Sequence, residues 1–113
     1  CIAGLLQGLS EAMNFSDKVG LNTDEVIEVI SKGAAQSWQM ENRWKTMIDD
    51  DYHHGFAVDL MRKDLDIVIG KAKKLNISLD VTKSVNEYYK DIQKAGGGRW
   101  DTSSLYKRLK DII

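Results

Sequence analysis

Proline and paired cysteines are both missing from this chain of 113 residues, which contains no proline and one cysteine, Cys1. A lone cysteine cannot build a disulfide framework, so we expect a protein of the reducing cytoplasm. Without proline, the helix ends must depend on glycine, asparagine and acidic residues as their start and stop signals.

Long hydrophobic runs and an excess of one charge are missing as well. No stretch approaches the roughly twenty consecutive apolar residues that a membrane-spanning helix needs. Sixteen basic residues offset seventeen acidic ones, and the two signs are interspersed. A nucleic-acid partner would require a basic face, which the sequence does not show. We therefore expect no membrane and no nucleic acid among the partners, and one domain from a chain of this length.

Apolar residues recur at helical spacing along nearly the whole chain, and the alternation that is typical of strands is scarce. Gly20 carries the signal of a helix end, while Asn22 and Asp101 are helix-capping residues. Three consecutive acidic residues, 49–51, are unfavourable at the negative end of a helix dipole and should end a helix. The predicted fold is all-α with about six helices, over residues 2–19, 23–31, 37–48, 60–75, 79–95 and 102–112.

The first of these helices begins without a capping residue, since apolar positions start directly after Cys1 and no initiator methionine is present. We expect the chain to be a fragment cut inside a helix that continues upstream. Ile2, Leu5, Leu6 and Leu9 should form an exposed apolar face that packs against neighbouring helices of the same or a partner subunit. The fragment should therefore self-associate.

The segment from Tyr52 to Asp66 carries the best candidate site. A Gly55–Phe56 turn leads into a helix whose first turns present Lys63 and Asp64, so an aromatic ring, a cation and a carboxylate can meet at one helix end. Such a group can receive an anionic substrate or cofactor. The alternative is an exposed Lys-Asp pair on a charged helix and a phenylalanine in the core.

The acidic and histidine-containing loop just before this segment does not predict a metal site. Asp49, Asp50, Asp51, His53 and His54 match none of the familiar zinc or calcium spacings, so a solvated acidic loop is favoured.

The remaining candidates have less specific signals. The run Gly96–Gly98 lacks the preceding strand of a phosphate-binding loop and indicates a flexible hinge. Arg99, directly after it, could contact a phosphate or carboxylate. Cys1 has no histidine or acid nearby and is not a nucleophile candidate. The tryptophans should fill the core or a subunit interface; they are Trp38, Trp44 and Trp100.

Six motifs in a fixed order carry a resemblance to a known family. They are Lys-Val-Gly-Leu-Asn at 18–22, Asp-Glu-Val-Ile at 24–27, Gly-Ala-Ala-x-Ser-Trp at 33–38, Gly-Phe at 55–56, Arg-Lys-Asp-Leu at 62–65 and Trp-Asp-Thr-Ser-Ser at 100–104. The chain resembles the C-terminal domain of the β-hydroxyacid dehydrogenases, in the 6-phosphogluconate dehydrogenase superfamily. This group includes 3-hydroxyisobutyrate dehydrogenase, tartronate semialdehyde reductase and glyoxylate/succinic semialdehyde reductase. The resemblance covers essentially the whole chain, and the Phe…Lys-Asp-Leu element is its most specific part.

The resemblance implies a two-domain enzyme that interconverts a small hydroxy acid and its semialdehyde or keto form. An N-terminal Rossmann domain, absent from this chain, would bind NAD or NADP. Residues 1–113 would be the helical substrate and dimerisation domain of a homo-oligomer, with residues 1–19 continuing the interdomain helix. By similarity, Lys63 would contact the cofactor near its nicotinamide end, and Phe56 and Asp64 would line the substrate side. Asp101 and Ser103 match a recurring Asp-x-Ser, which we interpret as a helix cap.

The family's catalytic lysine lies early in the linking helix, which would place it upstream of Cys1. Lys18 is too far along the same helix to replace it, so we expect no catalytic residue in this chain and no activity from the fragment alone. The alternative function is a non-catalytic helical oligomerisation or scaffold module derived from such a dehydrogenase.

Overall fold

The computed structural model describes residues 1–113 and contains six α-helices and no β-sheet. The helices are α1 (Ile2–Lys18), α2 (Thr23–Ile30), α3 (Trp38–Ile48), α4 (Val58–Lys74), α5 (Asp80–Lys94) and α6 (Leu105–Lys107). The 3₁₀-helix η1 (Thr102–Ser104) leads into α6, and the π-helix η2 (Arg108–Ile112) follows it. The all-α prediction with six helices is confirmed. None of the helices combines the length and the apolar character required to cross a bilayer.

Most helix ends lie where the capping residues predict them. Gly20, with a φ of 80°, follows α1 in the left-handed conformation that glycine tolerates. The side chain of Asn22 accepts a hydrogen bond from the Glu25 amide at the start of α2, and Ser37 accepts one from the Met40 amide at the start of α3. These bonds satisfy amides that have no partner inside the helix.

Helix α4 begins at Val58, two residues before the predicted start. Its first amides donate to a distant segment, Val58 to the Trp100 carbonyl and Asp59 to the Gly98 carbonyl, each at 2.9 Å. The helix start therefore depends on a partner about forty residues away, which no local pattern reveals.

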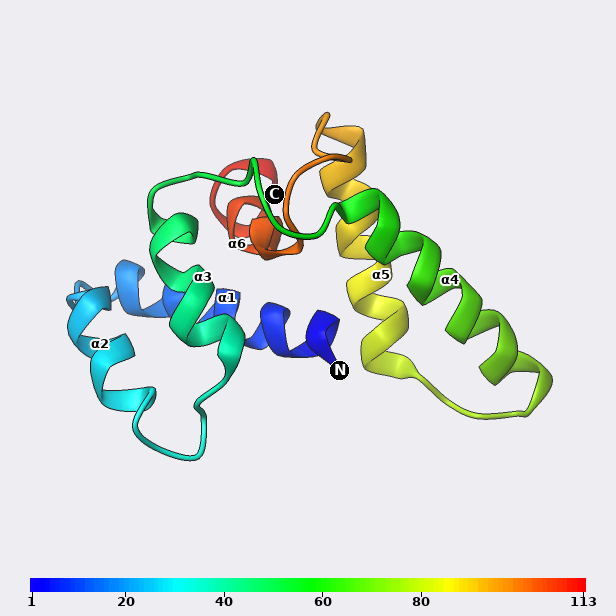
Figure 1. The fold of residues 1–113 in the computed structure, drawn as a ribbon, viewed down its shortest axis with the longest axis horizontal. Coiled ribbons are helices and arrows are strands. Elements are labelled where there is room, and N and C mark those ends of the chain that lie inside the picture. The colour runs from blue at the N-terminus through cyan, green and yellow to red at the C-terminus, as the bar shows by residue number, and fades with distance from the viewer.

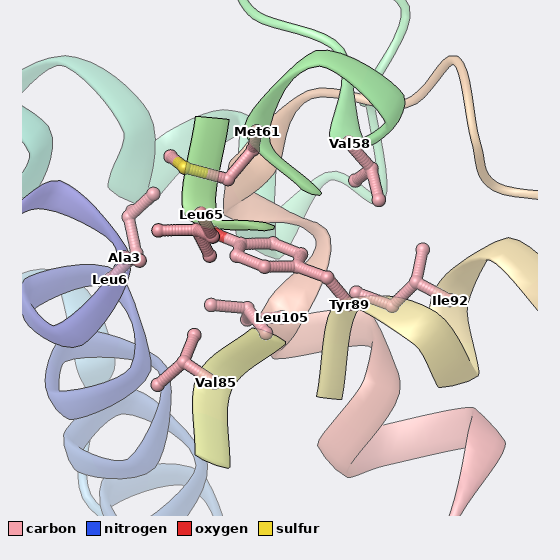
Figure 2. Packing of buried hydrophobic residues seen from close by; sticks show 9 residues of the cluster. All are labelled: Ala3, Leu6, Val58, Met61, Leu65, Val85, Tyr89, Ile92 and Leu105. Atoms are coloured by element: carbon pink, nitrogen blue, oxygen red, sulfur yellow. The ribbon is translucent and has the colours of Figure 1, made fainter. Parts of the chain in front are cut away.

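Helix α1 is the central element: the α4–α5 pair lies beside its N-terminal end, α2 lies at its C-terminal end, and α3 crosses in front of it in the view of Figure 1. The first half of α1 contributes to a core beneath α4, α5 and α6, where the fully buried Tyr89 lies among aliphatic side chains (Figure 2). Gly4 allows α5 to come close, because a Cβ at Gly4 would lie 3.2 Å from Val81. This cluster comprises Ala3, Leu6, Val58, Met61, Leu65, Val85, Tyr89, Ile92 and Leu105.

The second half of α1 belongs to another core, shared with α2, α3 and α6. Its members are Leu9, Met13, Ile27, Met40, Met47, Tyr52 and Tyr106. Trp100 is half-buried and packs against both clusters. The predicted exposed face of α1 is wrong for Leu6 and Leu9, which these two cores bury, whereas Ile2 and Leu5 remain 49% and 40% exposed.

One further prediction requires correction. The glycine run is not a hinge, since a Cβ at Gly97 would lie 2.2 Å from the Trp100 ring and one at Gly98 would lie 2.5 Å from an Asp59 carboxylate oxygen. These glycines allow close packing instead. Trp44 packs against the second cluster as predicted, whereas Trp38 is 57% exposed, so only the subunit-interface alternative remains for it.

Candidate functional site

A pocket of about 610 Å³ opens where four segments meet, within the size range of small-molecule sites. The start of α1 contributes Ile2 and Ala3, and α3 contributes Trp38, Gln39 and Arg43. The loop before α4 supplies Gly55 and Phe56, and α4 itself supplies Met61, Asp64 and Leu65. Asp101 and Thr102, at the start of η1, form the remaining wall.

Asp101 connects the segments that form this pocket through hydrogen bonds. Its buried carboxylate accepts hydrogen bonds from the Phe56 amide at 2.8 Å, from the Ser103 amide at 3.1 Å and from the Ser103 hydroxyl. The backbones pair as well, with the Asp101 amide donating to the Tyr52 carbonyl and the Thr102 amide donating to the Phe56 carbonyl. The bonds to Ser103 confirm the predicted cap. The bond to Phe56 fixes the loop that begins α4.

Gly55 is required where this loop passes Asp101. Its φ of 71° lies in the left-handed region, and a Cβ at this position would lie 2.0 Å from an Asp101 carboxylate oxygen. Only glycine meets both conditions. The Gly-Phe motif thus positions the phenylalanine ring through a carboxylate 45 residues away.

Tyr89, in the core, makes a hydrogen bond to the chain segment that carries Asp101. Its hydroxyl donates to the Thr102 carbonyl at 3.1 Å, and burial together with the nearby Asp101 charge raises the pKa of this phenol far above its usual value. The phenol therefore remains protonated, which keeps it a hydrogen-bond donor to the segment that carries Asp101.

The three residues proposed from sequence separate into two groups. Phe56 and Asp64 both line the pocket, and Phe56 is 43% exposed, so it is not a core residue. Lys63 is not part of the lining. Its ammonium nitrogen lies 3.7 Å from an Asp64 oxygen, with both side chains more than half exposed.

Arg43 is the functional candidate that sequence reasoning missed. It is the only lysine or arginine in the lining; its Nε lies 3.5 Å from Asp101 Oδ2 and its guanidinium 4.9 Å from the centre of the Trp38 ring. The only available signal was local, an arginine one to two turns after a tryptophan on one helix. Its partner Asp101 lies 58 positions further along, beyond the reach of any spacing argument.

The other sequence candidates lie elsewhere. Arg99 is exposed and is not part of the pocket. In the loop before Gly55, the His54 ring lies 3.0 Å from the Asp51 carbonyl, and no three histidine, cysteine, aspartate or glutamate side chains gather as metal ligands.

Comparison with known proteins extends over almost the whole chain. Residues 1–109 match a family described as NAD-binding of NADP-dependent 3-hydroxyisobutyrate dehydrogenase. An uncharacterized oxidoreductase of Shewanella frigidimarina is 54% identical over 110 residues, which cover 97% of this chain and 38% of the relative. L-threonate dehydrogenase of Escherichia coli K12 is 33% identical over 103 residues, which cover 91% of this chain and 34% of that enzyme.

A solved structure agrees with this relationship. The crystal structure of 3-hydroxyisobutyrate dehydrogenase from Salmonella typhimurium matches with a TM-score of 0.83 at 32% identity, over 94% of this chain and 38% of that one. The chain thus spans between 34% and 38% of the length of these relatives. The resemblance seen in the sequence is confirmed, and the chain belongs to the NAD-binding family of the NADP-dependent 3-hydroxyisobutyrate dehydrogenases.

Proposed function

We propose that this chain is the helical substrate domain of an NAD(P)-dependent dehydrogenase that acts on small hydroxy acids. The observation that carries the proposal is the pocket of about 610 Å³, which Phe56 and Asp64 line together with residues of α1 and α3. The chain that forms it matches the family over residues 1–109. The names of two relatives, L-threonate dehydrogenase and 3-hydroxyisobutyrate dehydrogenase, support a hydroxy acid as the substrate class. Acids of the 3-hydroxyisobutyrate, tartronate semialdehyde, glyoxylate and succinic semialdehyde type fit a pocket of this size.

In this proposal, the chain's own residues bind and orient the substrate. The Phe56 ring, fixed through its amide to Asp101, contacts the carbon skeleton together with Met61 and Leu65 and excludes water. The Asp64 carboxylate, on the same pocket wall, can accept a hydrogen bond from a substrate hydroxyl. By similarity to the family, we assign Lys63, whose ammonium nitrogen lies 3.7 Å from Asp64, to the nicotinamide end of the cofactor.

NAD or NADP is the implied cofactor, and it supplies the hydride transfer when bound. The pocket suits a small acid better than a whole dinucleotide, and the chain has no glycine-rich strand–turn–helix for a pyrophosphate. We therefore propose that a Rossmann domain outside these residues binds most of the dinucleotide. This chain would contact only its nicotinamide end.

The proton that accompanies the hydride needs a donor, and the family resemblance implies that this donor is a lysine. No lysine or histidine lines the pocket, and the Asp101 carboxylate already accepts three hydrogen bonds. We therefore place the catalytic lysine outside residues 1–113 as well.

The test uses the full-length protein and follows reduction of NAD⁺ and NADP⁺ with a panel of small hydroxy acids. We expect Lys63→Ala to raise the KM for the cofactor, and Asp64→Asn to raise the KM for the substrate, each by about tenfold or more, the loss of a charge-assisted contact. Lys71→Ala removes an exposed lysine two turns further along α4 and is the matched control. If Lys63→Ala matches the wild type in cofactor KM and kcat, the role assigned to Lys63 is wrong.

The second candidate is the non-catalytic oligomerisation or scaffold module. The absence of a lysine or histidine from the pocket lining favours it over an autonomous enzyme. A full-length protein that carries the upstream lysine and turns over a hydroxy acid rules this candidate out. One that binds the dinucleotide without turnover supports it.

A further inference from the structure

Arg43 occupies a position in the pocket that the proposed roles leave unexplained. It is the only lysine or arginine in the lining, and its side chain is 21% exposed. The Trp38 ring lies against one face of the guanidinium, at 4.9 Å, and the Asp101 carboxylate lies near Nε. Both neighbours restrict the rotation of a side chain that is otherwise flexible, so the charge is held in place before any ligand arrives.

A second arginine in the same chain shows what a structurally satisfied guanidinium looks like. Arg108 also lies over an aromatic ring, Tyr88 at 4.2 Å, and beside an aspartate, Asp91. Its Nε and Nη2 lie 2.9 and 2.8 Å from Asp91 Oδ2, so both donors are used by this one carboxylate. Arg108 therefore joins η2 to α5, with two of its nitrogens directed at one carboxylate.

Arg43 differs at this point, because its aspartate is already occupied. The Asp101 oxygens accept from the Phe56 amide and from Ser103, and Arg43 Nε stays 3.5 Å away without a hydrogen bond. Nη1 donates only to the adjacent Asn42 carbonyl at 3.3 Å, and Nη2 makes no hydrogen bond. An arginine that lines a pocket with Nη2 and most of its N–H groups unused is the arrangement that recognises carboxylate and phosphate groups.

We propose that Arg43 is the anion-recognition residue of this pocket. Its free guanidinium edge binds an oxyanion, either the carboxylate of the hydroxy acid or a phosphate of the cofactor. Gln39, on the same helix, adds a second unused group, because its side-chain oxygen is buried without a partner and can accept from a hydroxyl of the ligand. The identity of the ligand rests on the proposed function, whereas the binding of an oxyanion does not.

The charges around the pocket are compatible with an incoming anion. Two carboxylates belong to the lining, Asp101 and Asp64. Hydrogen bonds from two amides and a hydroxyl stabilise the charge of the first, and Lys63 is paired with the second at 3.7 Å. Arg43 is then the positive group with unused donors.

The first arm of the test is kinetic and uses the full-length protein. Arg43→Gln should raise one KM by about tenfold to a hundredfold, the range expected for a lost charge-assisted contact. If Arg43→Gln raises the KM for the hydroxy acid but not the KM for its uncharged amide analogue, the bound group is the carboxylate. If Arg43→Gln raises the KM for the cofactor, the bound group is a phosphate. Unchanged KM values for both would overturn the proposal.

Two variants control this arm. Arg108→Gln removes the satisfied arginine and should lower stability without changing either KM. Arg43→Lys keeps a charge beside Asp101 but loses the planar donor fork, so it should fold and still bind the anion less tightly. If Arg43→Gln does not fold, the KM values of Arg43→Lys are compared with those of the wild type instead.

The second arm does not depend on catalysis. 3-Hydroxypropionate and inorganic phosphate are titrated separately into the ¹⁵N-labelled 113-residue chain, and the Trp38 indole resonance is followed by NMR. We expect a saturable shift with at least one of the two anions, retained in Arg108→Gln and lost in Arg43→Gln. The absence of a saturable shift in the wild type, or equal affinity in Arg43→Gln, contradicts the assignment. Saturable binding in a protein without dehydrogenase activity supports Arg43 and removes the proposed function.

Discussion

At the scale of single residues, the site depends on Asp101 and on the glycine that passes it. The Asp101 carboxylate connects three chain segments, through the Phe56 amide, Ser103 and Arg43. Gly55 leaves room for that carboxylate and adopts a φ of 71°. The position of the Phe56 ring in the pocket thus depends on Asp101 and Gly55.

Gly55→Ala tests this dependence, and Gly20→Ala is its matched control. Both glycines have a positive φ, but a Cβ at Gly20 would meet nothing within 4 Å, whereas one at Gly55 would overlap Asp101. Gly20→Ala should lower the free energy of unfolding by about 1 kcal/mol through backbone strain alone. Gly55→Ala should lower it by about 3 kcal/mol, because a buried hydrogen bond is also lost. Urea denaturation measures both, and equal losses would contradict the role given to Asp101.

The family resemblance, carried by the Gly-Phe and Lys-Asp-Leu motifs, pointed to Phe56 and Asp64, and both line the pocket. Sequence reasoning missed Arg43, whose pocket partners are far away in the chain. It also recognised Asp101 only as a cap for Ser103, which is two residues away, and not as the acceptor for Phe56. Contacts within one turn can be predicted from spacing, whereas contacts across the fold cannot.

At the scale of elements, α3 is the helix that brings Trp38, Gln39 and Arg43 to the pocket. Its start is fixed by Ser37, whose hydroxyl accepts from the Met40 amide at 3.0 Å. Helix α2 begins with the equivalent bond from the Glu25 amide to Asn22, at 3.1 Å, and does not contribute to the pocket. The two caps are therefore a matched pair.

Ser37→Ala and Asn22→Ala should each lower the free energy of unfolding by about 1 kcal/mol, the typical value of a helix cap. Only Ser37→Ala should also raise the KM for substrate, because fraying of α3 moves Trp38 and Gln39. Thermal denaturation and steady-state kinetics measure the two effects. A similar rise in KM for Asn22→Ala would show that global stability, not the position of α3, controls binding.

The helices themselves could be predicted well, because their apolar spacing and their caps are local features. The exceptions have long-range causes. Helix α4 starts two residues before its predicted start, because the Trp100 and Gly98 carbonyls accept hydrogen bonds from its first two amides. The run of glycines is packed because Trp100 and Asp59 lie against Gly97 and Gly98. Both exceptions come from the segment 98–102, whose pairing with the Gly55–Phe56 loop the sequence does not reveal.

At the scale of the whole molecule, α1 joins two cores, and one group of exposed apolar side chains lies along α4 and in the loop after it. Val68 and Leu75 are one heptad apart and share a helix face, as do Leu60 and Ile67. Ile77, in the loop that follows, is 51% exposed. Apolar surface of this kind indicates contact with another domain or a second copy.

We therefore expect the chain to self-associate at micromolar concentrations, now on the basis of α4 and not of Leu6 and Leu9. Val68→Glu should weaken the association by placing a charge in the contact, while Glu87→Lys, an exposed change on α5, should not. Sedimentation velocity measures both. A wild-type chain that remains monomeric throughout the micromolar range would remove the homo-oligomer proposal for this domain.

We propose that the pocket between α1, α3 and α4 binds the substrate of a hydroxy-acid dehydrogenase. The two phenylalanines of the chain provide the most direct measurement, because both are exposed and only Phe56 lines the pocket, while Phe15 lies on α1 outside it. In the full-length protein, Phe56→Ala should lower kcat/KM for the hydroxy acid about tenfold or more, as expected for the loss of a buried aromatic contact. Phe15→Ala should leave kcat/KM unchanged. Equal kcat/KM values for the wild type and Phe56→Ala would contradict substrate binding in this pocket.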